Sequence, residues 1–157
     1  MTLTCFNRVL SASKSGVFAD SKQEAKLFDA LDALGEVYQP HRPYQHSRRG
    51  RICDAFVPVR GLYIECYGGT CPPNDAGSKE YLAVMRAKVG HFAGCPSCGR
   101  LLVVFRSAIY GKEFHAHLRK AINARLFDKV NFLGDESNVF SYYYARMTEN
   151  VTIFQGS

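Results

Sequence analysis

The chain has 157 residues, of which 46 % are hydrophobic, so it is long and apolar enough to form one domain and is not a disordered tail. No apolar run approaches the roughly 20 residues of a membrane-spanning helix, and the N-terminus lacks the apolar segment of a secretion signal. We therefore expect a cytoplasmic protein that is not secreted. The net charge of +6 favours an anionic partner, although many ordinary basic proteins carry a similar charge.

The first predicted element is a helix. Residues 1–20 show no clear hydrophobic period and form an N-terminal arm. Ser21 and Glu24 then have the spacing of a capping box, in which the serine caps the helix and the glutamate lies in its first turn. Apolar residues follow at helical spacing until Gly35, so the pattern predicts a helix over residues 22–34.

Short strands and loops are expected next. The predicted strands are 36–41, 52–59 and 62–67, separated by a polar, basic loop at 40–50 and followed by a loop at 68–77. Ser78 is expected to cap a second helix. The unbroken apolar run LLVVF at 101–105 is typical of a central strand that is buried on both faces.

The C-terminal part predicts a basic third helix over 111–126 and short strands around 139–144 and 151–154. The order helix, three strands, helix, strand indicates an αβββαβ core within about 21–125, followed by a β extension over 126–157. We predict a single α/β domain with a mixed β-sheet flanked by helices.

Two acidic residues interrupt the apolar strands on either side of the turn near Arg60 and Gly61. Because side chains alternate along a strand, Asp54 and Glu65 share one side of the sheet in either plausible register. In one register Asp54 lies directly opposite Glu65; with the turn centred on Arg60 and Gly61 it lies opposite Tyr67 instead, and Glu65 is its diagonal neighbour. Directly opposed Cβ atoms are about 4.5–5.5 Å apart, so like charges there repel each other.

Three arrangements would offset this repulsion: a proton shared by the two acids, a nearby Arg or Lys, or a divalent cation such as Mg²⁺ or Mn²⁺. The alternative is that one acid points outward at a strand end and is solvated. A third acid, Glu24, borders the apolar stripe of the first predicted helix, although it is also the glutamate of the capping box. We expect Glu24, Asp54 and Glu65 to converge on one pocket.

This arrangement resembles the PD-(D/E)XK nuclease superfamily over roughly residues 21–106. The resemblance rests on four segments in order, which are SKQEA with Glu24, ICDAFV with Asp54, LYIECYG with Glu65, and a helix followed by LLVVFR. Their order and spacing are most similar to small phage junction-resolving or homing-type endonucleases.

The resemblance implies a restriction-endonuclease-like fold and an Mg-dependent endodeoxyribonuclease that hydrolyses phosphodiester bonds in branched or site-specific duplex DNA. Asp54 and Glu65 would hold one or two Mg²⁺ or Mn²⁺ ions that polarise the scissile phosphate, and Glu24 would complete the metal site. A homodimer would match the two strands of a duplex. The implied catalytic residues are Glu24, Asp54, Glu65, Tyr67 and Lys88.

The sequence departs from the family pattern at two positions. Cys53 precedes the aspartate where proline is common, and Tyr67 stands where the family has a lysine that helps to deprotonate the attacking water. Tyrosine, with a free pKa of about 10, is a poor base. Lys88 in the second predicted helix would replace the missing cation, with Lys79 and Arg86 as further candidates; each is otherwise expected on a solvated helix face.

The segment CPSC offers a second metal prediction. Cys95 and Cys98 form half of a zinc knuckle, and Cys71 and His91 are the nearest candidates for the other two ligands, with Cys5 as a further choice. The very-short-patch repair endonucleases, a branch of the same superfamily, resemble the chain in carrying a structural zinc near this region. A pair of reduced thiols in a turn is the alternative.

Basic residues gather before the acidic pair and along the third predicted helix. The predicted nucleic-acid contacts are Arg42, Arg48, Arg49, Arg51, Lys112, Arg119 and Lys120. Ordinary solvated surfaces are the alternative. Two functions compete with the nuclease: a catalytically weak or inactive nucleic-acid-binding or assembly protein on the same fold with a structural zinc, and a zinc-containing interaction module in which the acids are structural.

Overall fold

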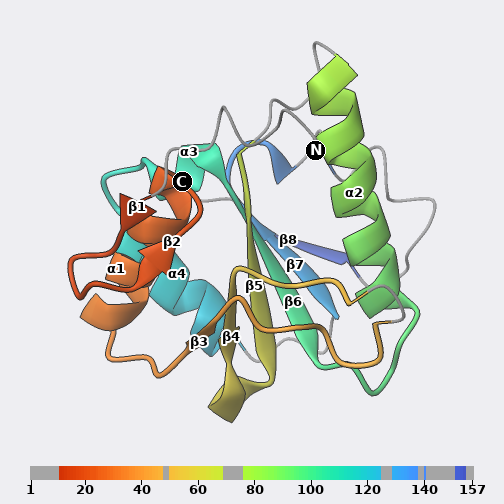
Figure 1. The fold of residues 1–157 in the computed structure, drawn as a ribbon, viewed down its shortest axis with the longest axis horizontal. Helices are drawn as coiled ribbons and strands as arrows, with labels where there is room; N and C mark the ends of the chain where they lie inside the picture. Colours follow the sequence, from red (N-terminus) through yellow and green to blue (C-terminus); the bar gives the residue numbers. More distant parts are fainter. Residues whose placement is uncertain are drawn as a thin grey trace.

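A six-stranded mixed sheet forms the centre of the molecule, with helices on both of its faces (Figure 1). The computed structural model describes residues 11–47, 50–68, 76–124, 129–137, 140 and, for the backbone only, 151–154. The strands of the sheet, in their spatial order, are β3 (Gln39–Pro40), β4 (Ala55–Val57), β5 (Leu62–Tyr67), β6 (Arg100–Phe105), β7 (Val130–Leu133) and β8 (Val151–Phe154). The helices are α1 (Lys22–Ala33), α2 (Ala76–Ala93), α3 (Arg106–Ile109) and α4 (Phe114–Asn123).

The sheet changes direction at β5. The strands β3, β4 and β5 pair antiparallel, whereas β5, β6, β7 and β8 pair parallel. The connection between the parallel strands β5 and β6 runs through α2, as parallel pairing requires a long crossover. The predicted class, an α/β domain with a mixed sheet flanked by helices, is confirmed.

The two faces of the sheet carry separate hydrophobic cores. The first lies under α1 and α4, where Phe28 and Leu118 pack with Ile64 of β5. The second lies under α2, where Val89 and residues such as Tyr63 are buried. Figure 1 shows α1 and α4 on one side of the sheet and α2 on the other. Alternate residues of β5 therefore belong to different cores, which explains why every residue of this strand is buried.

The first helix follows the sequence prediction closely. The Ser21 side chain accepts a hydrogen bond from the backbone N–H of Glu24 and caps α1. Gly35 follows the end of the helix with a φ of +73°, a left-handed conformation that glycine adopts without steric cost. The Glu24 side chain itself contacts His41 rather than completing a capping box.

A two-stranded sheet packs on α1. It is formed by β1 (Ser11–Ala12) and β2 (Phe18–Ala19), which pair antiparallel. Ala19 is buried in the core under α1, so this part of the predicted N-terminal arm covers the helix. Within the described residues, no helix is both long and apolar enough to cross a membrane.

Several predicted boundaries were wrong. The helix α2 begins at Ala76, so Ser78 lies inside its first turn and is not its cap. The predicted helix over 111–126 is α4 alone, preceded by the separate short helix α3 and a turn. The sequence analysis missed β7, and Phe140 is helical rather than part of a strand, while the rest of the predicted strand 139–144 lies outside the described residues.

The predicted basic loop at 40–50 is mostly a β-hairpin arm. Backbone hydrogen bonds join His41 to Asp54, Arg42 to Cys53 and Tyr44 to Arg51, in the register that β3 and β4 begin. The sequence does not indicate this strand, because it contains prolines and charged residues. These residues are tolerated here because the hydrogen-bond ladder is interrupted and the strand lies at the sheet edge. The consequence is that residues 41–44 run directly alongside Asp54.

The strand register decides between the two alternatives for the acidic pair. Ala55 pairs with Ile64 and Val57 pairs with Leu62, so Asp54, one residue before β4, falls opposite Glu65. The turn is longer than two residues, since a 3-10 turn over Pro58–Arg60 precedes Gly61.

We expect Gly99→Ala to destabilise the fold. Gly99 has a φ of +76°, and an added Cβ would lie 2.6 Å from the backbone oxygen of Gly61, which also accepts a hydrogen bond from Arg100. The strained backbone and the clash together should lower the free energy of unfolding by about 2–4 kcal/mol, measured by chemical denaturation. Gly16→Ala is the control: its φ is +86° but no atom lies within 4 Å of the added Cβ, so it should cost only about 1 kcal/mol. Equal losses in the two variants would contradict the close contact.

Candidate functional site

Two carboxylates and one ammonium group meet where β4 and β5 begin to separate. Glu65 lies on the face of β5 covered by α2, and only 2 % of its surface is exposed. Asp54 is partly buried and close enough to Glu65 for their carboxyl groups to hydrogen-bond when one carries a proton. One oxygen of Asp54 accepts a hydrogen bond of 2.6 Å from the backbone N–H of Cys66, which fixes its orientation.

Lys88 supplies the positive charge at this pair. Its side chain extends from the fourth turn of α2, and its Nζ lies 3.0 Å from Oε1 of Glu65 and 3.4 Å from the backbone oxygen of Ile52. Among the three cations considered for this role, the structure brings Lys88 to the acids. Lys79 and Arg86 lie on the exposed surface of α2.

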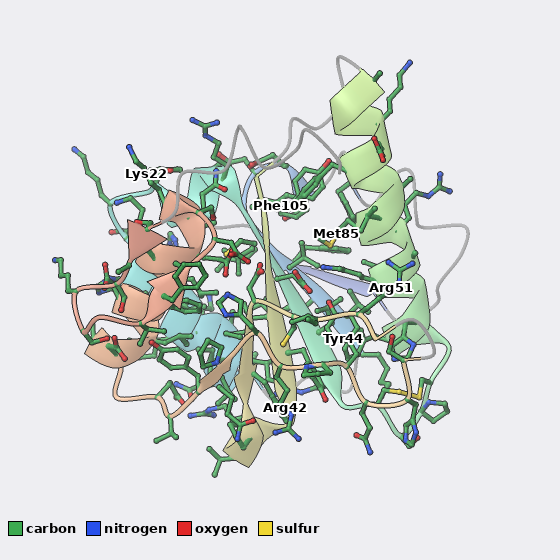
Figure 2. All side chains as sticks on the ribbon, viewed as in Figure 1. Lys22, Arg42, Tyr44, Arg51, Met85 and Phe105 are labelled. Carbon is green, nitrogen blue, oxygen red and sulfur yellow. A yellow bond between two sulfur atoms is a disulfide. The ribbon has the colours of Figure 1, made fainter. Side chains whose placement is uncertain are left out.

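Tyr44 is a further member of the group, which the sequence analysis did not identify. Its hydroxyl donates a hydrogen bond to Oε1 of Glu65, and its ring lies 5.9 Å from Nζ of Lys88. Figure 2 shows Tyr44, together with Met85, in the space between the sheet and α2. Tyr44 therefore helps to hold both the carboxylate and the ammonium group.

Burial dominates the electrostatics of the pair. It raises the pKa of Glu65 to about 8, and the negative charge of Asp54 adds to the rise, while Lys88 and the Tyr44 hydroxyl oppose it. Burial also raises the pKa of Asp54, against the Cys66 N–H and the charge of Lys88. One lysine therefore does not neutralise the two carboxylates. At neutral pH the carboxylate pair needs a bound proton or a further cation.

A second group of ligand-forming side chains lies on the α1 side. His41 Nε2 is 2.8 Å from Oε1 of Glu24 and 3.9 Å from Oδ2 of Asp20. One ligand atom from each of these three residues lies within 4.8 Å of the others. Burial, and then the charge of Asp54, raise the pKa of Glu24 to about 7, while the hydrogen bond with His41 opposes the rise.

The three predicted acids lie in two adjoining groups. Glu65 contacts Lys88, whereas Glu24 contacts His41. Asp54 acts electrostatically on both Glu24 and Glu65. The expectation that all three acids converge on one pocket stays a prediction.

Tyr67 follows Glu65 by two residues in β5. It is fully buried, and its ring packs against Tyr81, Phe105 and Phe140 at centroid distances of 5.0–5.6 Å. This packing makes Tyr67 a core residue, and its predicted catalytic role stays a prediction.

Three of the four predicted zinc ligands lie together at the C-terminal end of α2. Cys95 and Cys98 are joined by a disulfide, and Sγ of Cys98 is 3.6 Å from Nε2 of His91. The backbone oxygen of Gln45 is 3.0 Å from the same His91 nitrogen. The fourth predicted ligand, Cys71, lies outside the described residues. Since a disulfide offers no thiolate, zinc binding here requires the reduced form.

The predicted nucleic-acid contacts do not form one surface. Arg42 stacks over the Phe56 ring at 4.9 Å, and Arg51 lies partly buried on the opposite strand of the same hairpin. Lys112, Arg119 and Lys120 are exposed near and along α4, which covers the other face of the sheet. Arg48 and Arg49 lie outside the described residues. Of the predicted contacts that the structure describes, Arg42 and Arg51 lie on the hairpin that adjoins Asp54 and Glu65.

The sequence analysis missed the roles of Asp20, His41 and Tyr44. It had marked the segment containing His41 and Tyr44 as a basic loop next to Asp54. The available signal was the alternation of His41, Arg42, Pro43 and Tyr44, which sends neighbouring side chains to opposite faces once the segment pairs with residues 51–54. Asp20 looked like an ordinary residue preceding a helix cap.

Comparison of the chain with known protein families, with characterised proteins and with solved structures finds no match.

We expect the metal-free protein to lose stability as the pH rises from about 4.5 to 8. Glu65 has an ordinary pKa of 4.5 and a folded-state pKa of about 8, so the folded state holds more protons across this interval. The free energy of unfolding should therefore fall, by no more than about 1.4 kcal/mol per pH unit for this group. Denaturant titrations in EDTA at several pH values measure it.

Glu65→Gln should reduce this pH dependence, because the amide does not titrate, while the contribution of Glu24 and Asp54 should remain. Glu80→Gln, which changes an exposed residue of α2, should leave the pH dependence unchanged. An equal pH dependence in Glu65→Gln and in the native sequence would contradict a raised pKa of Glu65.

The zinc site stays a prediction, and its test depends on the redox state. After reduction, the chain should bind about one Zn²⁺, because His91 and both cysteines then offer ligand atoms at one place. Metal analysis after dialysis measures the zinc content. Cys98→Ser should lose the ion, whereas Ser97→Ala, an exposed position between the cysteines, should retain it. A fully reduced protein without zinc would rule the site out.

Proposed function

We propose that the chain is a metal-dependent DNA endonuclease with a restriction-endonuclease-like fold, acting on duplex or branched DNA. The main support for this proposal is the group formed by Asp54, Glu65 and Lys88. A buried and a partly buried carboxylate are opposed across antiparallel strands, and an ammonium nitrogen lies 3.0 Å from one of them. The succession α1, β3, β4, β5, α2, β6 supports the proposed fold, since it repeats the predicted αβββαβ order.

The donor set fits a hard divalent cation. Asp54 and Glu65 offer carboxylate oxygens, the ligand type that Mg²⁺ and Mn²⁺ prefer. Burial raises the pKa of both groups, so a doubly charged ion would favour their ionised forms. When bound, such an ion would supply Lewis-acid polarisation of a phosphate oxygen.

Lys88 would take the role that the family gives to the lysine two positions after the glutamate. Its ammonium group is held by Glu65 and by the backbone oxygen of Ile52, so it is fixed before a substrate arrives. A fixed positive charge stabilises the additional negative charge that develops on a phosphate during hydrolysis. The departure at Tyr67 is thereby compensated from the neighbouring helix.

Tyr44 and Cys66 would orient the two acids. The Tyr44 hydroxyl donates to Glu65, and the Cys66 N–H donates to Asp54, so neither carboxylate turns freely. Arg42 and Arg51, on the hairpin that adjoins the pair, would contact the phosphate backbone. A homodimer would place two such groups on the two strands of a duplex.

A nucleic-acid-binding or assembly protein without cleavage activity is the second candidate. Tyr67 favours it, because the family lysine is missing from β5 itself. The two candidates differ in one result: both bind DNA, but only the nuclease cuts it.

We expect the protein to nick or cut DNA in Mg²⁺ or Mn²⁺. The test is a cleavage panel of supercoiled plasmid, four-way junction, single-stranded DNA and RNA, each with both ions. Asp54→Asn and Glu65→Gln should abolish cutting, because each removes a charged oxygen ligand. Lys88→Met should reduce the rate by about 10²–10³-fold, the usual effect of losing one electrostatic contact to a transition state.

Lys79→Met is the matched control, since Lys79 lies on the same helix but is exposed. Its cleavage rate should equal that of the native sequence. Cutting that persists in both acid variants would come from a contaminant or another site and would overturn the assignment. DNA binding without any cutting in the panel would favour the second candidate.

A further inference from the structure

We propose that Asp20, Glu24 and His41 form a second cation site, which takes a first-row transition ion of the Mn²⁺ class. One ligand atom from each residue lies within 4.8 Å of the other two. None of its three ligands belongs to the Asp54–Glu65 pair, and the proposal does not depend on the proposed nuclease function.

The three ligands come from separate segments that the fold brings together. Asp20 directly precedes the cap of α1, Glu24 lies in the first turn of that helix, and His41 follows β3. The His41 backbone N–H donates a hydrogen bond of 3.1 Å to the backbone oxygen of Asp54, which ties the imidazole to the hairpin. The ligand positions are therefore set by α1 and by strand pairing rather than by a free loop.

The Glu24 carboxylate is buried within the group, where it contacts His41. Only 7 % of its side chain is exposed, and within the described residues its carboxylate has no hydrogen-bond or ion-pair partner outside the group. Burying a carboxylate is costly unless positive charge compensates it. Asp20, with 41 % of its side chain exposed, leaves an entrance for the ion from solvent.

The charges around Glu24 are mostly negative. Asp20 and Asp54 both act on it unfavourably, whereas His41 acts favourably through its hydrogen bond and its charge. Lys88, the cation of the neighbouring pair, is instead bonded to Glu65. Even a protonated His41 would leave the carboxylates in excess, whereas a divalent ion would balance them.

The ligand types predict which ion binds. Carboxylate oxygens suit Mn²⁺ and Mg²⁺ alike, whereas imidazole nitrogen suits transition ions such as Zn²⁺, Fe²⁺ and Ni²⁺ rather than Mg²⁺, so a site with both ligand types favours a transition ion. The Asp54–Glu65 pair offers oxygen alone, whereas His41 adds a nitrogen to the second site. Mg²⁺ in excess should therefore displace Mn²⁺ from the first site more readily than from the second.

Pulsed EPR of Mn²⁺ bound to the full chain tests the proposal, because nitrogen coupling reports an imidazole ligand. The native protein should show this coupling, and it should persist in excess Mg²⁺. His41→Gln should remove the coupling and weaken Mn²⁺ binding at this site by roughly tenfold or more. Asp20→Asn changes a more exposed residue that folding tolerates better, and it should also weaken binding in calorimetry.

His46→Gln is the matched control, since His46 is an exposed histidine of the same hairpin and also has a positive φ. It should keep the nitrogen coupling. Coupling that is absent from the native protein, or that survives in His41→Gln, would overturn the proposal.

Asp54→Asn separates this inference from the nuclease proposal. It should abolish cleavage but retain the nitrogen coupling, because His41 and its two acids remain. Loss of the coupling in Asp54→Asn would show one shared site and would also overturn the second site. If the native protein binds Mn²⁺ through nitrogen but cuts no substrate, the second site stands and the nuclease proposal fails.

Discussion

The antiparallel register of β4 and β5 sets Asp54 opposite Glu65 and thereby creates the electrostatic constraint on which the candidate site depends. Two like charges on directly opposed strand positions, one buried and one partly buried, are unstable without compensation. The chain compensates in part, through an ammonium group from α2, a tyrosine hydroxyl and a backbone N–H. The Asp54–Glu65 pair still requires further positive charge, and a bound divalent cation would supply it.

The hairpin formed by residues 39–44 and 51–56 connects the two sides of the sheet. It sends His41 toward α1 and Tyr44 toward α2, from positions three residues apart. Asp54, on the opposite strand, acts on the acids of both groups. One edge hairpin therefore supplies ligands or supporting contacts to each group, and a change in its pairing would disturb both.

The cysteine cluster at the end of α2 belongs to the same structural unit. His91 contacts the backbone of Gln45 and stacks on the Tyr44 ring, while Lys88 lies one turn earlier on the same helix. Whether disulfide-bonded or zinc-bound, this cluster fastens α2 to the hairpin. It thereby keeps Lys88 and Tyr44 in place around Glu65, even though it takes no direct part in the chemistry proposed there.

The sequence by itself determined the elements with strong local signals: the capped helix α1, the apolar strands β5 and β6, and the placement of Asp54 and Glu65 on one side of the sheet. These follow from hydrophobic period and alternation, which act over a few residues. Only the tertiary structure decided that Lys88 forms an ion pair with Glu65, that Tyr67 is a core residue, and that Glu24 lies beside His41 and Asp20. Each of these depends on which face of the sheet a distant segment covers, and side-chain spacing along the chain carries no information about that packing.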